Sequence, residues 1–133
     1  MTRLLGALRY GIYGFFTLLS GDTPQNQQRA FVRYMVEAEL KATQKYGLLR
    51  GGRGGTAFFT SERPLRSSAA AADRYSLRTN PDVAVIFRFA GKTPPYTTGV
   101  TEADKLGHRG GGIEHTVGYP APIEILNVLG LEP

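Results

Sequence analysis

The 133-residue sequence contains no cysteine. Its fold therefore has no disulfide and no thiolate–metal site, and it does not depend on the redox state of its surroundings. The two histidines, His108 and His115, lack the further ligands that a metal site needs. The glycine-rich stretch RGGRGG at 50–55 lacks the lysine and hydroxyl of a P-loop and the spacing of a dinucleotide fingerprint. These absences argue against the common metal and nucleotide motifs.

A long uninterrupted hydrophobic run is also missing. The most apolar segment, residues 4–19, repeats its apolar side chains at helical spacing, but Arg9 interrupts it and no small-residue cleavage site follows. We expect residues 1–30 to form an apolar helix and a polar connector, without stable membrane insertion. The helix is interpreted as packing on the core or on a neighbouring chain, with membrane association as the alternative.

The composition is that of an ordinary globular domain. Apolar residues make up 41% of the chain and charged residues 20%. We therefore expect a single domain, with its folded core in residues 31–133. The net charge of +5 favours polyanionic partners such as nucleic acid, nucleotides or an acidic protein surface. Seventeen glycines and eight prolines indicate several tight turns.

The order of predicted elements indicates an α+β domain. Runs of β-branched and aromatic residues predict strands at 31–36, 54–61, 83–89, 113–117 and 123–129. Helices are predicted at 37–47, which Gly47 would end, and at 67–77, where serine precedes four alanines. Residues 90–112 are predicted as a loop. Because strands alone follow the second helix, we expect a mixed or antiparallel sheet with two or three helices.

Three polar features lie on predicted strands and could carry chemistry. Arg33 either faces solvent or makes a forked contact with a phosphate or ribose oxygen. Thr60 and Ser61 either cap the next turn or brace a ligand. Glu114 follows three glycines, which allow close backbone approach, and it either faces solvent or serves as a functional carboxylate.

Two further features are basic or titratable. His108 and His115 flank Glu114 and could act as acid and base in RNA cleavage. Arg50 and Arg53 lie in the glycine-rich stretch, which is either a solvated basic turn or a loop that binds phosphate through its arginines and backbone amides.

Taken together, these features resemble a known enzyme family. An arginine on the first strand, a hydroxyl-ended aromatic strand and a glutamate on a late strand resemble the mono-ADP-ribosyltransferase fold, in its arginine–serine/threonine–glutamate branch. The runs RYMVEAELKATQKYGLLRGGRGGTAFFTS, PDVAVIFRF and GGGIEHT look more narrowly like the toxin domains of bacterial polymorphic toxins, such as those on Rhs repeats. The resemblance covers about residues 31–131 and leaves the apolar segment at 4–19 unexplained.

The resemblance implies a substrate and a set of site residues. Glu114 would be the catalytic glutamate, hydrogen-bonding the ribose next to the bond to nicotinamide. NAD, as substrate and without any metal, would be held by Arg33, Tyr34, Phe58, Phe59, Thr60, Ser61, Arg50 and Arg53. Arg33 would anchor a ribose or phosphate, and the hydroxyls would shape the nicotinamide pocket.

One position departs from the family pattern. Members of this branch that modify arginine carry a second glutamate two residues before the catalytic one, and here that position is Gly112. The resemblance therefore implies an acceptor other than arginine.

The expected function is that of a toxin delivered into the cytoplasm of a target bacterium. It would transfer ADP-ribose from NAD to RNA or to a protein, and a neutralising immunity protein would be its partner. Two alternatives remain open at this point: a metal-independent ribonuclease that uses His108 or His115, and a non-enzymatic basic module that docks through 4–19. In the second alternative Arg33 and Glu114 would point apart.

Overall fold

A computed structural model describes residues 29–50, 55–118 and 120–133. The predicted helix at 4–19 and Arg53 lie outside these ranges. The strands are β2 (Phe31–Met35), β3 (Leu48–Leu49), β4 (Ala57–Phe59), β5 (Val83–Phe89), β6 (Thr97–Val100), β7 (Ile113–Val117) and β8 (Ala121–Gly130); the helices are α2 (Glu37–Tyr46) and α3 (Ser68–Tyr75). The described residues thus form an α+β fold with two helices.

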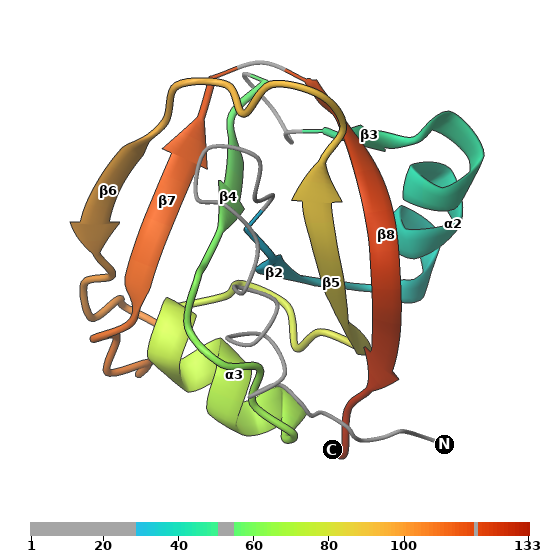
Figure 1. The fold of residues 1–133 in the computed structure, drawn as a ribbon. Coiled ribbons are helices and arrows are strands. Elements are labelled where there is room, and N and C mark those ends of the chain that lie inside the picture. Colours follow the sequence, from blue (N-terminus) through green and yellow to red (C-terminus); the bar gives the residue numbers. More distant parts are fainter. Residues whose placement is uncertain (1–28, 51–54, 119) are drawn as a thin grey trace.

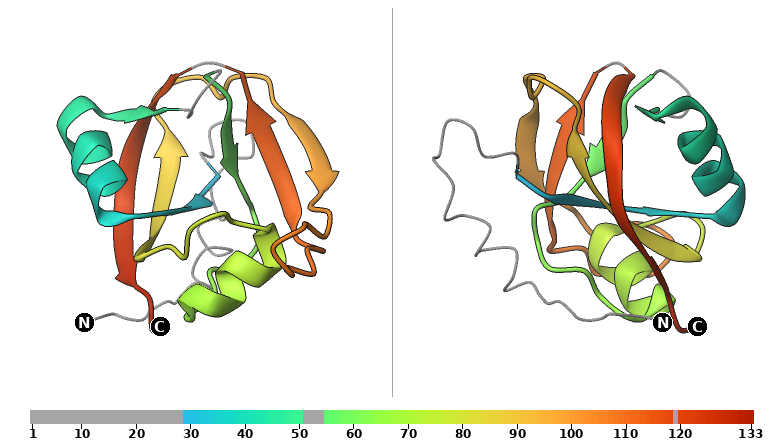
Figure 2. Two further views of the ribbon diagram at one scale, coloured as in Figure 1. Left: turned by 180° about the vertical axis from the view of Figure 1, so that it is seen from behind. Right: turned by 45° about the vertical axis from the view of Figure 1, so that its right-hand side comes forward.

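The strands form two antiparallel sheets. One has the order β2-β5-β8-β3 and the other the order β4-β7-β6. Figures 1 and 2 show α2 beside the four-stranded sheet and α3 across the lower ends of the strands, below the space between the two sheets. The prediction of an α+β domain with a mixed or antiparallel sheet is confirmed, and both sheets are antiparallel. Within the described ranges, no helix is long and apolar enough to cross a membrane.

The core lies between the sheets and is built from phenylalanines. Phe31 of β2 packs edge-on against Phe59 of β4, with ring centroids 5.0 Å apart, and Phe87 and Phe89 of β5 close the cluster. Each ring is at most 3% exposed, so each stabilises the fold by roughly 2–3 kcal/mol through burial. The aromatic runs of the sequence therefore hold the two sheets together.

Strand β5 is buried on both faces. Val83, Val85, Phe87 and Phe89 share one face, as the sequence predicted, and they belong to the main core. The opposite face, with Ala84 and Ile86, packs in a smaller cluster with Val32 of β2. Because β5 lies between β2 and β8, its backbone hydrogen bonds are also satisfied on both sides.

Both predicted helix signals are confirmed. The Ser67 hydroxyl accepts a hydrogen bond from the Ala70 amide at 3.1 Å and caps α3. Helix α2 ends at Gly47, whose φ of 66° lies in the left-handed region that favours glycine, and the Gly47 amide donates to the Thr43 carbonyl. Both helices are shorter than predicted, by one to three residues.

Several strand predictions were wrong in extent. The predicted loop at 90–112 contains β6, which was missed because all four of its residues are exposed and only one of them, Val100, is a large apolar residue. The two-residue strand β3 was also missed. Strand β4 covers Ala57–Phe59 rather than 54–61, and β8 begins at Ala121, where its first residues pair with β3.

The two sheets meet at Thr60. Strand β4 pairs with β7 as far as Phe59 and His115, and Thr60 then forms a bridge with Val32 of β2. The Thr60 amide donates to the Val32 carbonyl at 2.9 Å, and the Val32 amide donates to the Thr60 carbonyl at 2.8 Å. The chain therefore leaves β7 at this point, and an opening forms beside the start of β7.

Candidate functional site

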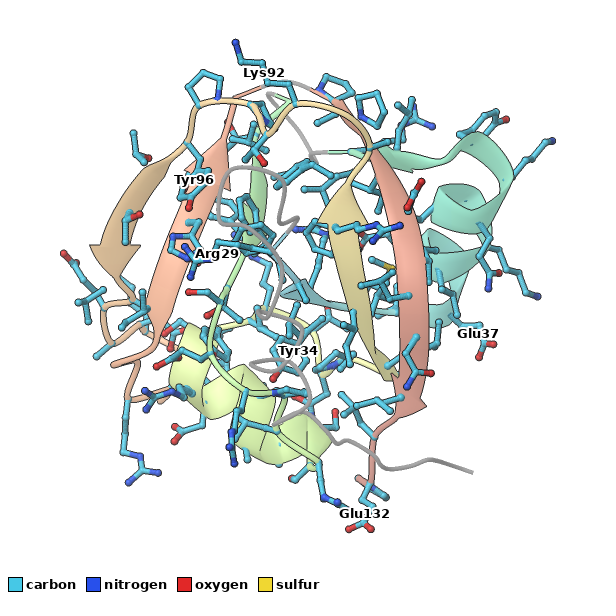
Figure 3. The ribbon with its side chains drawn as sticks, in the orientation of Figure 1. Arg29, Tyr34, Glu37, Lys92, Tyr96 and Glu132 are labelled. Carbon is cyan, nitrogen blue, oxygen red and sulfur yellow. The ribbon has the colours of Figure 1, made fainter. Side chains whose placement is uncertain are left out.

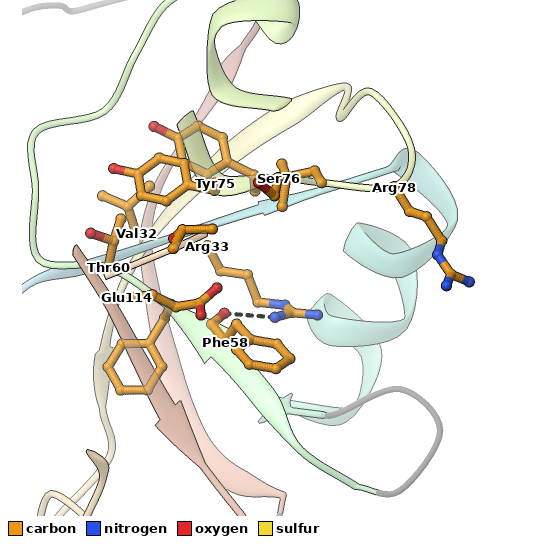
Figure 4. Close-up of a pocket in the computed structure, with 12 residues that line it drawn as sticks. Val32, Arg33, Phe58, Thr60, Tyr75, Ser76, Arg78 and Glu114 are labelled. Atoms are coloured by element: carbon orange, nitrogen blue, oxygen red, sulfur yellow. Dashed lines mark hydrogen bonds between the residues drawn. The ribbon is translucent and has the colours of Figure 1, made fainter. Parts of the chain in front are cut away.

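A cavity of about 360 Å³ lies at the point where β4 leaves β7 (Figure 4). This volume is within the range of pockets that bind small molecules. The lining residues come from β2, β4, β7, the end of α3 and the segments next to them: Val32, Arg33, Tyr34, Phe58, Phe59, Thr60, Tyr75, Ser76, Leu77, Arg78, Thr101 and Glu114.

Six of the residues predicted from the sequence line this one cavity. They are Arg33, Tyr34, Phe58, Phe59, Thr60 and Glu114. Arg33 is on β2 and Glu114 on β7, so residues from different sheets meet here. Figure 4 shows both side chains extending into the same space.

The guanidinium of Arg33 is fixed by two hydrogen bonds. Its Nε donates to Glu39 Oε2 at 2.7 Å, and its Nη1 donates to the Phe58 carbonyl at 2.6 Å. The side chain is only 15% exposed. Because a guanidinium has five N–H donors, those that remain can bind an anionic or hydroxyl group of a ligand in the cavity.

The carboxylate of Glu114 has a different environment. Among the described residues it has no hydrogen-bond or ion-pair partner, whereas the Arg33 guanidinium in the same cavity is held by two hydrogen bonds. Burial raises the pKa of Glu114 above its usual value. A half-buried carboxylate without a partner costs stability, which is typical of a group held ready for a ligand.

Two stacked tyrosines form an aromatic wall of the cavity. The rings of Tyr34 and Tyr75 are 5.4 Å apart with an interplanar angle of 30°. The Tyr34 hydroxyl accepts a hydrogen bond from the Leu65 amide at 2.8 Å, and burial raises the pKa of Tyr34 to about 12. Burial also raises the pKa of Tyr75, so both hydroxyls are neutral at physiological pH and the wall carries no charge.

The two predicted hydroxyls have different positions. Thr60 is 2% exposed and lines the cavity, and its hydroxyl donates to the Ile113 carbonyl at 2.6 Å. The structure does not bring Ser61 to the cavity, because successive side chains of an extended chain point to opposite sides. The Ser61 hydroxyl instead lies 2.9 Å from His115 Nε2.

The two histidines belong to separate networks. His115 is 6% exposed and is held between Ser61 and Thr98, which lies 2.9 Å from Nδ1. The ring of Tyr96, labelled in Figure 3, packs 4.8 Å from the His115 ring. Burial, reinforced by Arg29, lowers the pKa of His115. His108 pairs with Asp104 at 2.7 Å in the loop before β7.

Of the two predicted loop arginines, the structure describes only Arg50, which does not line the cavity. The Arg50 guanidinium lies over the ring of Tyr46, 5.4 Å from its centroid, and Arg50 is not one of the lining residues. Arg53 lies outside the described residues.

Sequence reasoning missed the contribution of α3 and the segment after it. Tyr75, Ser76, Leu77 and Arg78 line the cavity, although the predicted helix was interpreted only as a structural element. The helix ends at Ser76, whose φ of 51° is uncommon for a residue with a side chain. Its hydroxyl donates to the Glu102 carbonyl at 2.6 Å.

Gly112 is required by close packing against the cavity wall. A Cβ atom at this position would lie 2.4 Å from Cε1 and 2.6 Å from Cδ1 of Tyr75, and 3.0 Å from Cγ of Arg74. The Gly112 amide also donates to the Arg74 carbonyl at 3.1 Å. A glutamate side chain therefore has no room here unless Tyr75 moves.

No group of three or more histidine, aspartate or glutamate side chains in the described ranges could hold a metal ion. No family model, curated protein or solved structure matches this chain.

Proposed function

We propose that the protein is an ADP-ribosyltransferase that cleaves NAD between nicotinamide and ribose and transfers ADP-ribose to an acceptor. The main support is that Arg33 lines the same cavity as the carboxylate of Glu114, which has no hydrogen-bond or ion-pair partner among residues 29–50, 55–118 and 120–133. The sequence resemblance gives these two residues the roles of NAD anchor and catalytic glutamate. The two antiparallel sheets, joined at Thr60, are compatible with the small ADP-ribosyltransferase-like fold that the resemblance implies.

The proposed mechanism depends on one charge. Cleavage of the bond to nicotinamide develops positive charge on the ribose, as in glycoside cleavage. A carboxylate held close to this oxocarbenium-like centre stabilises the transition state more than the ground state. Glu114 supplies the negative charge, and Arg33 binds a ribose or phosphate oxygen. Tyr34, Tyr75 and Phe58 offer apolar surface to the nicotinamide ring. Nicotinamide leaves without net charge, so no strong acid is needed.

The acceptor is proposed to be RNA, or a protein that is modified at a residue other than arginine. Gly112 carries no carboxylate to deprotonate a guanidinium, and the Tyr75 ring occupies the adjoining space. The net charge of +5 supports RNA, although it also suits an acidic protein surface. As the resemblance implies, the protein would be an effector delivered into the cytoplasm of a target bacterium and neutralised by an immunity protein.

The two alternatives have less support. A ribonuclease would need an accessible histidine, yet both ring nitrogens of His115 are engaged and the residue is 6% exposed. His108 pairs with Asp104 through Nδ1 and does not line the cavity. A non-enzymatic module was expected to have Arg33 and Glu114 pointing apart, whereas both line one cavity.

The proposal predicts transfer from NAD to a cellular molecule. Purified protein is incubated with a bacterial lysate and NAD labelled in the adenylate, and RNA and protein fractions are analysed by mass spectrometry. We expect one added ADP-ribose on an acceptor, and no labelling when NAD is omitted. RNA that is degraded without NAD, with no added mass, would contradict the proposal and select the ribonuclease.

A further inference from the structure

On the side that faces β4, the start of β7 is held by side chains rather than by the backbone of a neighbouring strand. Where the β4 chain turns toward β2, Ile113 loses a backbone partner on that side. Two side chains replace it. The Thr60 hydroxyl donates to the Ile113 carbonyl at 2.6 Å, and Glu62 Oε1 accepts from the Ile113 amide at 3.2 Å. The residue that follows Ile113 is Glu114.

Glu62 is the centre of this arrangement. Besides the Ile113 amide, its carboxylate accepts hydrogen bonds from Arg74 Nε at 3.0 Å, from Arg74 Nη2 at 2.7 Å and from the Tyr75 hydroxyl at 2.6 Å. The contact with Arg74 is a forked ion pair, which fixes direction as well as distance. One carboxylate thus joins the segment after β4, the end of α3 and the start of β7.

The network is partly buried and charged. The Glu62 side chain is 21% exposed, and its hydrogen bonds from Arg74, followed by those from Tyr75 and Ile113, lower the pKa of Glu62. The carboxylate therefore stays ionised at physiological pH. The network also includes Gly112, whose amide donates to the Arg74 carbonyl and where an added Cβ atom would lie 2.4 Å from the Tyr75 ring. Glu62 itself is not among the residues that line the cavity.

We propose that Glu62 is a positioning residue, which holds the Glu114 carboxylate in the cavity by fixing Ile113, the residue before Glu114, and Tyr75, which lines the same cavity. The inference rests on the proposed function, because it assigns Glu62 to the cleavage step. A displacement of the order of 1 Å at a reacting group can cost about 100-fold in rate, so a residue outside the cavity can control catalysis.

The test variant is Glu62→Gln, which keeps the size of the side chain. An amide nitrogen cannot accept a hydrogen bond. If the glutamine oxygen takes the Oε1 position, the bond from Arg74 Nη2 is lost; if it takes the Oε2 position, the bonds from Arg74 Nε, Tyr75 and Ile113 are lost. In both cases the negative charge that pairs with Arg74 is removed. We expect kcat for NAD cleavage to fall about 10- to 100-fold with KM for NAD changed less than threefold, because Arg33 and Tyr34 still bind NAD. The Ile113 amide should exchange with solvent at least 10-fold faster.

A milder variant and a matched control complete the set. Arg74→Lys keeps the charge but loses the fork, and we expect a three- to tenfold fall in kcat. Glu124→Gln removes another Arg–Glu pair of equal length, 2.7 Å to Arg88 across β5 and β8, and neither residue lines the cavity. Its kcat should stay within twofold. All rates are measured well below the melting temperature of each variant, so that lost stability alone does not lower kcat.

The outcomes separate this inference from the proposed function. A wild-type protein that cleaves NAD, together with a Glu62→Gln variant whose kcat stays within twofold, would overturn the positioning role and leave the function standing. If neither protein cleaves NAD, the proposed function fails, and with it the assignment of Glu62 to catalysis, even where faster exchange at Ile113 shows that the contacts exist. If Glu62→Gln does not fold, Arg74→Lys decides by the same kcat criterion.

Discussion

Replacing Glu114 with glutamine is expected to lower kcat for NAD cleavage by about 10²- to 10³-fold. Glutamine has nearly the same size as glutamate but no negative charge, so the oxocarbenium-like ribose loses its stabilising partner. Arg33 stays fixed by Glu39 and the Phe58 carbonyl, so KM for NAD should change little. The fold should be unaffected or slightly more stable, because the substitution removes a half-buried charge that no side chain in the described part of the chain pairs with. Release of nicotinamide measures the rate.

The pH dependence of activity provides a second test of the role of Glu114. The proposed mechanism needs Glu114 ionised, and burial raises the pKa of Glu114 above its usual value, so activity should fall on acidification at a higher pH than an ordinary glutamate would give. The Glu124→Gln variant, with an exposed glutamate changed, should keep the wild-type profile. A Glu114→Gln protein with wild-type kcat would show that this carboxylate does not act in the reaction.

Replacing Gly112 with alanine is expected to destabilise the fold by about 3 kcal/mol. The new methyl group would lie 2.4 Å from the buried Tyr75 ring, and Tyr75 is only 6% exposed, so the ring has little space to move. The backbone of Gly112 is not in the left-handed region, so the penalty comes from contact rather than from strain. The melting temperature should fall by about 10 °C.

Two further variants test the cause of this penalty. Gly99→Ala adds a methyl group in β6 that, its two chain neighbours aside, would have no atom of the described residues within 4 Å, and the variant's stability should be equal to or slightly above that of the wild type. In a Tyr75→Ala background the Gly112→Ala penalty should shrink by about 1–2 kcal/mol, since the clashing ring is gone. An equal penalty in both backgrounds would show that Tyr75 is not what excludes a side chain at this position.

The sequence predicted the parts of the fold that local chemistry determines. Strand β5 was found because its seven residues are almost all β-branched or aromatic, and α3 was found because Ser67 precedes helix-forming alanines. Strand β6 was missed because an exposed edge strand needs no apolar alternation. The early departure of β4 from β7 could not be predicted either, because it depends on the bridge between Thr60 and Val32.

The candidate site was predicted in part for a similar reason. Arg33 and Glu114 were noticed because charged residues are uncommon on largely apolar strands. Glu62 and Tyr75 had no such signal, since one follows a strand and the other ends a helix. Their roles arise only when α3 lies against the start of β7, where the Tyr75 hydroxyl donates to Glu62 at 2.6 Å. Ser61 looked equivalent to Thr60 in the sequence, but alternation along the chain directs it to His115.

The most direct test of the shared cavity is an NMR titration of the labelled protein with NAD, which follows each backbone amide and the Arg33 Nε–H. We expect saturable shifts that cluster at Arg33, Phe58, Thr101 and Glu114, all of which line the cavity. Shifts confined to distant surfaces such as Tyr46 and Arg50, or no shift at millimolar NAD, would contradict the proposal that this cavity binds NAD.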